Sequence, residues 1–476
     1  MEANESVTEL IGNTPLLRLR TSGEGQSAAV YGKLEYLNAG GSVKDRIGLR
    51  MIEQAEHDGL LRPGGTVVEA SSGNTGLGLA MVAAARGYRM VAVLSDRASS
   101  EKVAAVRAFG AEVVLKAAGV PREHPEHVMN AAARIAEETP GGWLAGQYDN
   151  PANPEAHYLS TGPEIWRQTG GRITHLVSCI GTGGTISGTG RYLKEVSGGT
   201  VQVIGADPAS SVYSGGDGRP YFVEAAGHWK HPETVEDVWP QSYHREVVDR
   251  VLPITDRQSI LTIRRLAREQ GLLVGGSAGT AVAAALTVAA EAGPEAVVVA
   301  ILPDSGRQYL TKYFDDDWLL RLGFLDGDPA AARVGDAVPA AAREQQLPYL
   351  NGRTSVADAL AALRAAGART ALPAGPCPAG PERRPTALEL AGSVTLEELT
   401  AAVQSGRAAL DDPVGEHLGA PLPRFGTGEP AEAALAELTE CGLEAAVVVY
   451  DGHAVGLVGA AELRQCLAAG TVATAG

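Results

Sequence analysis

The stretch "THLVSCIGTGGTISGTG", residues 174–190, has the pattern that decides the fold. An apolar run of strand length is followed by a turn rich in glycine and threonine, and then by a helix-like segment. The same order recurs in "GTVVEASSGNTGLGLA", residues 65–80, and in "VGGSAGTAVAAAL", residues 274–286. Strand, turn and helix repeated in this way predict an α/β protein with a buried parallel sheet.

Six short apolar runs before residue 325 are expected to be parallel strands, because each is followed by a turn and an Ala-rich helical pattern. These runs cover residues 65–70, 90–95, 111–116, 174–180, 201–207 and 296–304. The alternation is typical of doubly wound α/β sheets, in which ligands bind beyond the carboxyl ends of the strands. The turns after residues 70, 180 and 275 are therefore the expected binding region.

The composition is that of a globular protein with ample material for a core, since 45% of the 476 residues are hydrophobic and 20% are charged. A net charge of −16 argues against nucleic acid and acidic membrane surfaces as partners. The polar start "MEANESVTEL" lacks the pattern of a secretory leader, and no apolar run reaches membrane-spanning length. We therefore expect a cytoplasmic protein whose four cysteines are reduced, since none forms a CxxC pair.

Composition divides the chain into three expected regions: an α/β domain over residues 1–325, a linker over 326–350 and a second domain over 351–476. The linker is expected because this stretch is rich in Ala and Pro and has few large apolar residues.

The last region contains two segments that echo each other. "SVADALAALRAAGARTAL", residues 355–372, and "PAEAALAELTECGLEAAVVV", residues 430–449, each place an amphipathic helix before a glycine and a strand. Each is followed by a strand that enters a helix, in "GSVTLEEL" at 392–399 and "VGLVGAAEL" at 455–463. This spacing predicts a pair of β-α-β repeats.

The turn after the first strand brings polar groups to the start of a helix. Its residues are Ser71, Ser72, Gly73, Asn74 and Thr75. Hydroxyls, an amide and helix N-terminal N–H groups in one small volume suit a carboxylate. The alternative is an ordinary helix cap, in which the same side chains satisfy the first turn.

The glycine-rich turn after residue 180 has the features of a phosphate cradle. It consists of Gly181, Thr182, Gly183, Gly184 and Thr185. Backbone N–H groups can approach a phosphate here, and two threonines add hydroxyls. Ile186 replaces the third glycine of a dinucleotide fingerprint, and no Gly-Lys-Ser/Thr follows. The alternative is a turn whose glycines only allow close packing.

Lys44, in "NAGGSVKDRI" at residues 38–47, places a cation at the start of a helix, where the macrodipole favours negative charge. It is either a surface lysine or an amine held for chemistry. Ser277 lies at the tip of the third turn, and Gln147 and Tyr148 begin a polar loop. The histidine pairs lack an extended metal-ligand pattern, so no metal site is expected.

Together, "GGSVKDR", "SSGNTG", "GTGGT" and "GGSAGT" resemble, in order and separation, the β-family (fold type II) pyridoxal-phosphate enzymes, over about residues 5–325. This family includes the cysteine synthases and the cystathionine β-synthases, and the resemblance implies a catalytic domain made of two doubly wound α/β subdomains. The runs at 38–59, 99–103, 147–158 and 301–325 are most similar to the cystathionine β-synthases, and residues 333–472 resemble the tandem CBS domains attached to those enzymes.

The resemblance implies a role for each of these residues. Lys44 would hold pyridoxal 5′-phosphate covalently, Asn74 would bond to the ring 3′-oxygen, and Ser277 would face the pyridine nitrogen. The turn 181–185 would bind the phosphate. The set implied to bind substrate comprises Ser71, Ser72, Gly73, Thr75, Gln147, Tyr148 and Glu224.

The implied reaction is a β-replacement. L-Serine or an activated serine would lose its α-proton to Lys44 and its β-substituent as the leaving group. The thiol of L-homocysteine would then add, to give L-cystathionine and water. A neutral hydroxyl at Ser277 makes the cofactor a weaker electron sink, which suits elimination more than transamination.

Two departures from the family pattern stand out. The loop "VEAAGHWKH", residues 223–231, differs from the family at the mouth of the site, which puts the second substrate in question. In the tail, Thr395 and Glu398 keep the Thr-x-x-acid pattern of adenosine-ribose contacts, while Gly459 replaces the hydroxyl residue before Glu462. An adenosyl ligand is therefore only weakly indicated, and a dimerising role is equally consistent with the tail.

Several alternatives stay open from sequence. A cysteine synthase would use O-acetyl- or O-phosphoserine with sulfide, and a specialised enzyme would join another nucleophile. A non-catalytic sensor would keep the fold only as a ligand-binding scaffold. We expect a homodimer or a larger homo-oligomer, in keeping with the family.

Overall fold

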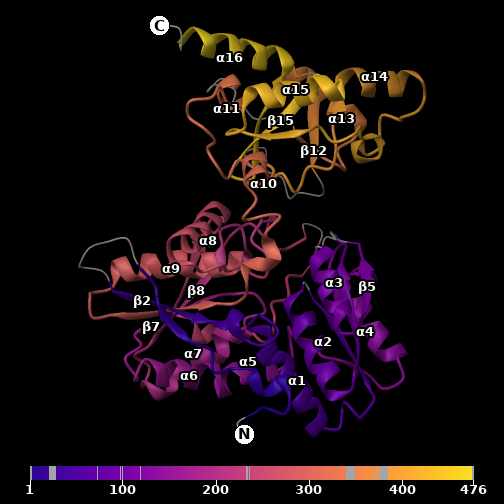
Figure 1. The fold of residues 1–476 in the computed structure, drawn as a ribbon. Helices are drawn as coiled ribbons and strands as arrows, with labels where there is room; N and C mark the ends of the chain where they lie inside the picture. Colours follow the sequence, from indigo (N-terminus) through magenta and orange to yellow (C-terminus); the bar gives the residue numbers. More distant parts are fainter. Residues whose placement is uncertain are drawn as a thin grey trace. The chain divides into compact units, whose positions relative to one another are not determined.

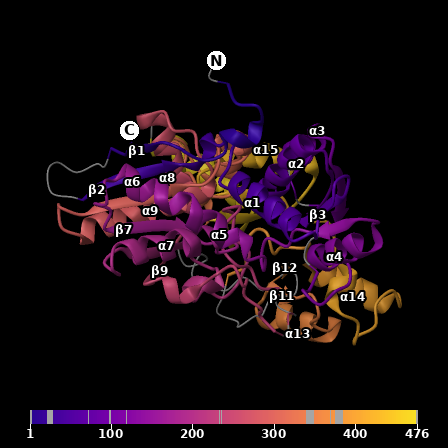
Figure 2. The same cartoon turned by 90° about the horizontal axis from the view of Figure 1, so that it is seen from below.

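The computed structural model describes residues 3–20, 28–71, 73–96, 98, 100–117, 120–231, 234, 236–338, 349–368, 370–374 and 384–473. The chain divides into two compact units. The first comprises Met1–Arg219 and Val223–Leu310, and the second Pro220–Phe222 and Thr311–Gly476. Figures 1 and 2 show the ribbon in two views.

A six-stranded sheet forms the larger half of the first unit. Its strands, in spatial order, are β1 (Leu16–Arg18), β2 (Ala29–Leu34), β10 (Val297–Leu302), β7 (His175–Cys179), β8 (Gln202–Pro208) and β9 (Arg250–Ile254). All neighbours are parallel except β1 and β2. Helices cover both faces (Figure 1): α8 (Asp256–Gln270) and α9 (Gly276–Glu291) on one, and α5 (Ala152–Leu159), α6 (Thr161–Gln168) and α7 (Gly184–Val196) on the other.

A four-stranded parallel sheet forms the other half. Its order is β5 (Glu112–Lys116), β4 (Arg89–Ser95), β3 (Thr66–Ala70) and β6 (Gly142–Leu144). One face packs against α1 (Lys44–His57), α2 (Asn74–Arg86) and α3 (Ser100–Ala108). The other face packs against α4 (Val128–Glu138).

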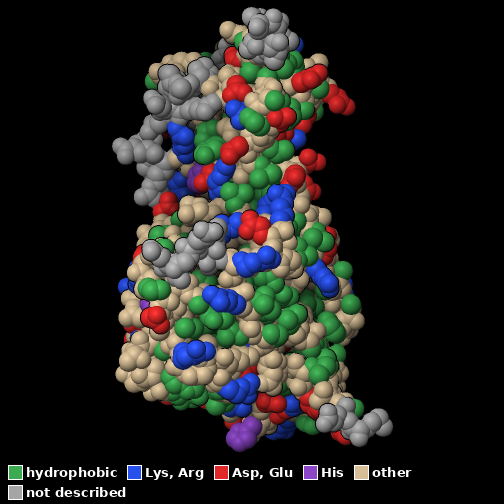
Figure 3. All heavy atoms as spheres, turned by 60° about the vertical axis from the view of Figure 1, so that its left-hand side comes forward, with side chains coloured by type: hydrophobic (Ala, Val, Ile, Leu, Met, Phe, Trp, Pro, Cys, Tyr) green, Lys and Arg blue, Asp and Glu red, His purple; other side chains and the backbone are tan. Residues whose placement is uncertain are grey.

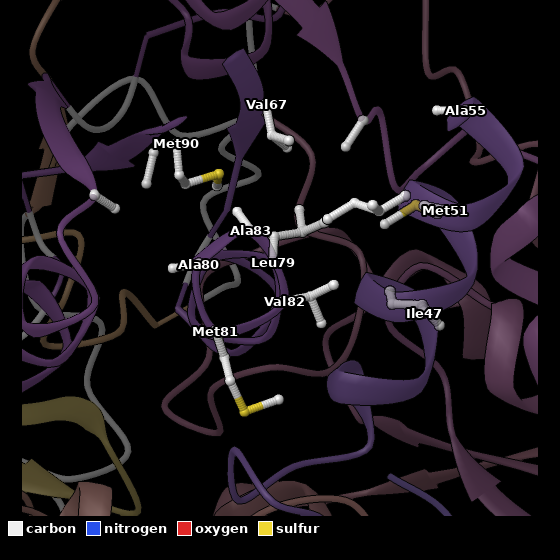
Figure 4. Packing of buried hydrophobic residues seen from close by; sticks show 14 of the residues in the cluster. Ile47, Met51, Ala55, Val67, Leu79, Ala80, Met81, Val82, Ala83 and Met90 are labelled. Atoms are coloured by element: carbon white, nitrogen blue, oxygen red, sulfur yellow. The ribbon is translucent and has the colours of Figure 1, made fainter. Parts of the chain in front are cut away.

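Helices α1 and α2 approach each other closely, which fixes the start of one beside the start of the other. Ile47 and Met51 of α1 face Leu79 and Val82 of α2 in the buried cluster of Figure 4. A Cβ added at Gly78 would lie 3.0 Å from the carbonyl oxygen of Lys44. A side chain at Gly78 would push the two backbones apart, so this glycine keeps Lys44 close to the second helix.

All six predicted strands are present as β3, β4, β5, β7, β8 and β10, with bounds within about two residues of those expected. The structure adds β1, β2, β6 and β9, and it distributes the strands over two sheets. β2 escaped prediction because Lys33, which is fully buried, interrupts its apolar pattern. β1 and β6 have three residues each, which is too short for a period to show.

The second unit contains two three-stranded sheets that follow the predicted repeat. One joins β11 (Tyr349–Asn351), β12 (Thr370–Ala374) and β13 (Val394–Thr395); the other joins β14 (Arg424–Gly426), β15 (Ala445–Tyr450) and β16 (His453–Gly459). Each has one parallel and one antiparallel pair. The accompanying helices are α13 (Val356–Ala365), α14 (Leu396–Gln404), α15 (Ala431–Cys441) and α16 (Ala460–Ala473).

Part of the stretch expected as a linker belongs to the core of the second unit. Residues Val334–Ala337 form α11, and Val334 is buried in a cluster with Phe425. The unit also begins earlier than residue 325, because α10 (Asp316–Arg321) and Phe324 are among its residues. Arg321 pairs with Glu437 at 3.0 Å. Residues 339–348 of the expected linker lie outside the described residues.

No helix in the described part of the chain is long and apolar enough to cross a membrane. Cys179, Cys441 and Cys466 are free thiols, while Cys377 lies outside the described residues.

Candidate active site

Lys44 is the first residue of α1, and its side chain is only partly accessible. Burial lowers the pKa of its amine below the ordinary value, although the nearby Asp304 opposes this shift. The amine donates no hydrogen bond within the described residues, so a buried amine with a lowered pKa has no hydrogen-bond partner there. These properties favour an amine held for chemistry over a surface lysine.

A buried ion network fixes the helix that carries this lysine. Arg46 pairs with Glu35 at 2.7 Å and with Glu164 at 2.7 Å, and Lys33 pairs with Glu164 at 2.5 Å. Burial would raise the pKa of Glu35, but the Arg46 guanidinium outweighs it and lowers that pKa to about 2. The charges stay ionised and paired, so the network ties α1 to β2 and α6.

The turn that begins α2 is partly occupied by its own hydrogen bonds. The Ser71 hydroxyl accepts from the amides of Gly73 at 3.0 Å and Gly76 at 2.8 Å, as the helix-cap interpretation expects. Thr75 Oγ1 donates to Gln147 Oε1 at 2.6 Å, so the structure brings Gln147 to this turn. The amides of Asn74 and Thr75 donate no hydrogen bond within the described residues, whereas Ser72 lies outside them.

The turn that begins α7 leaves its backbone donors open. Within the described residues, none of the five amides from 181 to 185 donates a hydrogen bond. Gly183 has a φ of 86°, and a Cβ there would lie 2.3 Å from Tyr243 Cβ. A Cβ on Gly184 would lie 1.8 Å from Asn153 Oδ1. Glycine is therefore required at both positions, and the open amides at a helix N-terminus form a ready anion site.

Two residues that sequence reasoning missed hold the hydroxyls of this turn. Asn153 Nδ2 donates to Thr182 Oγ1 at 3.0 Å, and His157 Nε2 lies 3.2 Å from Thr185 Oγ1. Burial lowers the pKa of His157 to about 3, so its imidazole is neutral near pH 7. Both lie in the polar loop and helix that begin at Gln147, which was the available signal.

Ser277, in the first turn of α9, is fully buried, and its hydroxyl has no partner within the described residues. Asn74 Oδ1 and Asp304 Oδ1 are also buried and without a partner there. Buried polar atoms normally find hydrogen bonds, so the unpartnered Ser277 hydroxyl indicates a polar ligand, and the Asn74 amide has a second N–H group to offer it. A ring with polar substituents, an aldehyde for Lys44 and a phosphate for the 181–185 turn fits these groups.

Glu224 reaches the α2 turn through a lysine that sequence reasoning did not select. The amine of Lys102, on α3, forms an ion pair with Glu224 and lies 4.9 Å from the centre of the Tyr309 ring. A Cβ on Gly73 would lie 2.8 Å from Lys102 Cδ. Lys102, a buried lysine beside this turn, therefore brings the Glu224 carboxylate to the site.

Tyr148 directly follows Gln147, and its carbonyl accepts from the Ser242 amide at 2.9 Å. Burial raises the pKa of its phenol to about 12, so the side chain is neutral. Within the described residues, no group of three or more His, Cys, Asp or Glu side chains has the arrangement of a metal site.

Comparison with known proteins adds a family. Residues 7–304 match the family described as "Pyridoxal-phosphate dependent enzyme". Relatives named cystathionine beta-synthase include those of Apis mellifera, 42% identical over 66% of this chain and 62% of the relative, and Oryctolagus cuniculus, 42% identical over 69% and 59%. The relative of Saccharomyces cerevisiae is 38% identical over 69% of this chain and 67% of its own. The chain thus spans less than two thirds of the length of the relatives from Apis mellifera and Oryctolagus cuniculus.

Among solved structures, that of O-ureido-L-serine synthase is 37% identical, with a TM-score of 0.59, covering 67% of this chain and 99% of that one. A mutant of that enzyme bound to O-ureido-L-serine has a TM-score of 0.58. The match spans the strands, the lysine helix and the glycine turns described above, and the chain belongs to the family of pyridoxal-phosphate dependent enzymes of fold type II.

Proposed function

We propose that this protein is a β-replacement enzyme of the cystathionine β-synthase type. It would condense L-serine with L-homocysteine to give L-cystathionine and water, or an activated serine with L-homocysteine to give L-cystathionine and the activating group as its acid. The observation that carries the proposal is the half-buried Lys44 amine, with its lowered pKa, among unpartnered polar atoms. The similarity to relatives named cystathionine beta-synthase supports this reaction over the others open to the family.

Three sets of residues would hold the cofactor. Lys44 would bind its aldehyde, Asn74 and Ser277 would contact the ring, and the amides of 181–185 would bind the phosphate with the hydroxyls of Thr182 and Thr185. When bound, pyridoxal phosphate withdraws electrons from the α-carbon of an amino acid, which makes its α-proton acidic and lets a β-substituent leave.

The start of α2 would bind the substrate carboxylate. The amides of Asn74 and Thr75 point from the positive end of the helix, and Ser72 is proposed to add its hydroxyl. Gln147 is held there by Thr75 and by its own bond to the Ala70 carbonyl at 3.2 Å. The proposed contribution of Ser71 and Gly73 is the shape of the turn, and Tyr148 would line its edge.

Lys44 would act as the general base once the substrate displaces it. Burial disfavours the charged ammonium, so a larger fraction of the amine is neutral and able to accept the α-proton near pH 7. The same nitrogen would return a proton when the new bond has formed.

Lys102 and Glu224 support an amino acid as the second substrate. An ammonium and a carboxylate side by side complement a zwitterion, which offers the opposite charge to each. Sulfide has no such pair of charges to present. We therefore favour homocysteine over sulfide, with Glu224 near its amine.

The second unit would be a tandem CBS module. Its Thr395 and Glu398 side chains bond to each other at 2.7 Å and cap α14, and Glu462 Oε2 accepts from the Gly459 amide at 3.1 Å. Groups that satisfy one another in this way support a structural or dimerising role more than an adenosyl site.

Self-association and a cytoplasmic location complete the proposal. Leu10, Leu37 and Leu159 of the first unit are about half exposed. Figure 3 shows apolar side chains on one face, interspersed with Lys and Arg. Apolar surface of this kind favours a homodimer.

A second candidate is β-replacement with another nucleophile, which the likeness to O-ureido-L-serine synthase favours.

The test of the proposal compares two pairs of substrates. Purified protein with pyridoxal phosphate is incubated with serine and homocysteine, and in parallel with O-acetylserine and sulfide. We expect cystathionine in the first mixture, and none from Lys44→Ala. If only the second mixture gives a product, and that product is cysteine, the protein is a cysteine synthase and the proposal is wrong. A wild-type protein that stays colourless with the cofactor would support a non-catalytic role instead.

A further inference from the structure

Asp304 lies just beyond the end of β10, where the backbones of two turns meet. Its carbonyl accepts from the Gly275 amide at 3.1 Å, and it forms a β-bridge with Ser42. Gly275 comes two residues before Ser277, and Ser42 two residues before Lys44. The backbone of Asp304 therefore ties the lysine turn to the serine turn.

The side chain of Asp304 extends this connection to the third turn. Its Oδ2 accepts from Asn74 Nδ2 at 2.7 Å and from the Tyr309 hydroxyl at 2.6 Å. The carboxyl group is fully buried. Asn74 begins a helix on the four-stranded sheet, whereas Asp304 follows a strand of the six-stranded sheet, so this hydrogen bond joins the two halves of the first unit.

The contact decides which end of an amide faces the site. An asparagine has a donor end and an acceptor end of nearly the same shape, and its partners determine the orientation. Here the nitrogen faces Asp304, and its second hydrogen is available for another acceptor. An oxygen on the cofactor ring that carries negative charge requires that donor and would be repelled by Oδ1.

We propose that Asp304, held by Tyr309, is a positioning residue that keeps the Asn74 amide nitrogen directed at the ring 3′-oxygen of pyridoxal phosphate. The proposal rests on the role given to Asn74 in the proposed function. Asp304 acts through Asn74 and touches no reacting atom. The charged groups that face the carboxyl are Lys44 and Lys102, and Tyr309 is the neutral donor.

The test is a double-mutant cycle on the holoenzyme, read by visible absorption and by the affinity of the apoprotein for pyridoxal phosphate. Asp304→Asn preserves size but presents an N–H group, which permits the Asn74 amide to reverse. We expect cofactor affinity to fall about tenfold, as for one buried hydrogen bond. The pH at which the visible absorption of the bound cofactor is halfway through its change should move by about one unit.

In the Asn74→Ala background, Asp304→Asn should cause no further loss of cofactor affinity, because the residue through which it acts is gone. The midpoint should keep only the part of its shift that comes from the charge of Asp304 acting on Lys44. Tyr309→Phe removes one hydroxyl and should shift the midpoint in the same direction by a smaller amount. It keeps the test decisive if Asp304→Asn does not fold. Asp207→Asn, at another buried aspartate, is the matched control and should leave the midpoint unmoved.

Equal effects of Asp304→Asn in the wild-type and Asn74→Ala backgrounds would overturn the proposal and indicate a purely structural role. An Asp304→Asn protein whose cofactor affinity and pH midpoint are both the same as those of the wild-type protein would also overturn it. A wild-type apoprotein that takes up no cofactor would overturn the proposed function itself, which is a different result.

Discussion

The turn that begins α7 and the turn that begins α14 both place hydroxyls and amides at the start of a helix, but they differ in what they leave free. In the first, five amides from 181 to 185 donate nothing within the described residues. In the second, Thr395 Oγ1 accepts from the Glu398 amide at 3.1 Å and donates to its carboxylate. The same chemistry is a binding site where it is unsatisfied and a helix cap where it is satisfied.

The largest expected effect comes from closing the open turn. Gly183→Ala would place a methyl group against Tyr243 at a left-handed φ, which displaces the amides. Affinity for pyridoxal phosphate should fall roughly 100-fold, as measured by titration of the apoprotein. Gly199→Ala is the matched control, because Gly199 has a φ of 83° and open space around it. Equal losses of affinity in both variants would refute the cradle.

The charge pair Lys102–Glu224 beside the α2 turn should affect one substrate only. Lys102→Met and Glu224→Gln should each raise the KM for homocysteine by about tenfold and change that for serine by less than about twofold. Steady-state kinetics with each substrate varied in turn provides the measurement. Lys116→Met breaks a comparable pair with Glu126 and serves as control. A uniform change in both KM values would remove this pair from the second-substrate site.

A buried carboxyl behind the α2 turn predicts a pH dependence of stability. Burial raises the pKa of Glu69 from 4.5 to about 8. Between these two pH values the unfolded chain loses a proton that the folded protein keeps. Ionisation of Glu69 therefore does not lower the free energy of unfolding below pH 4.5, but it does so increasingly as the pH rises to 8.

Glu69→Gln should flatten this decline, which amounts to at most about 1.4 kcal/mol per pH unit. Thermal unfolding of both proteins at pH 5, 6, 7 and 8 gives the comparison. Parallel curves for the two proteins would show that Glu69 is ionised in the folded state.

The smallest effect is expected at the satisfied cap. Thr395→Ala should lower the stability of the second unit by about 1 kcal/mol and leave β-replacement activity unchanged. Calorimetry and the activity assay test both parts. If the wild-type protein responds to an adenosyl compound and this variant does not, Thr395 belongs to a ligand site and is not only a helix cap.

Sequence patterns predicted strands where apolar residues dominate, as at 90–95, and failed where a charge is buried, as at Lys33. A buried lysine is recognisable only through Glu164, which lies far along the chain. The turns themselves were predictable because glycine, serine and threonine follow each strand.

The roles of their supports were not predictable. Asn153, His157, Lys102 and Asp304 lie in runs whose similarity to the family was recognised, but they act through partners that only the fold brings together. The unsatisfied atoms that distinguish a site from a cap are likewise a property of three-dimensional packing.

The central claim is that Lys44 binds the cofactor. Borohydride reduction of the holoenzyme would make that bond permanent, and peptide mass spectrometry would locate it. We predict a phosphopyridoxyl group on the peptide that contains Lys44 and on no other. A label on Lys33 or Lys102 instead, or no label on a protein that has taken up the cofactor, would contradict the account.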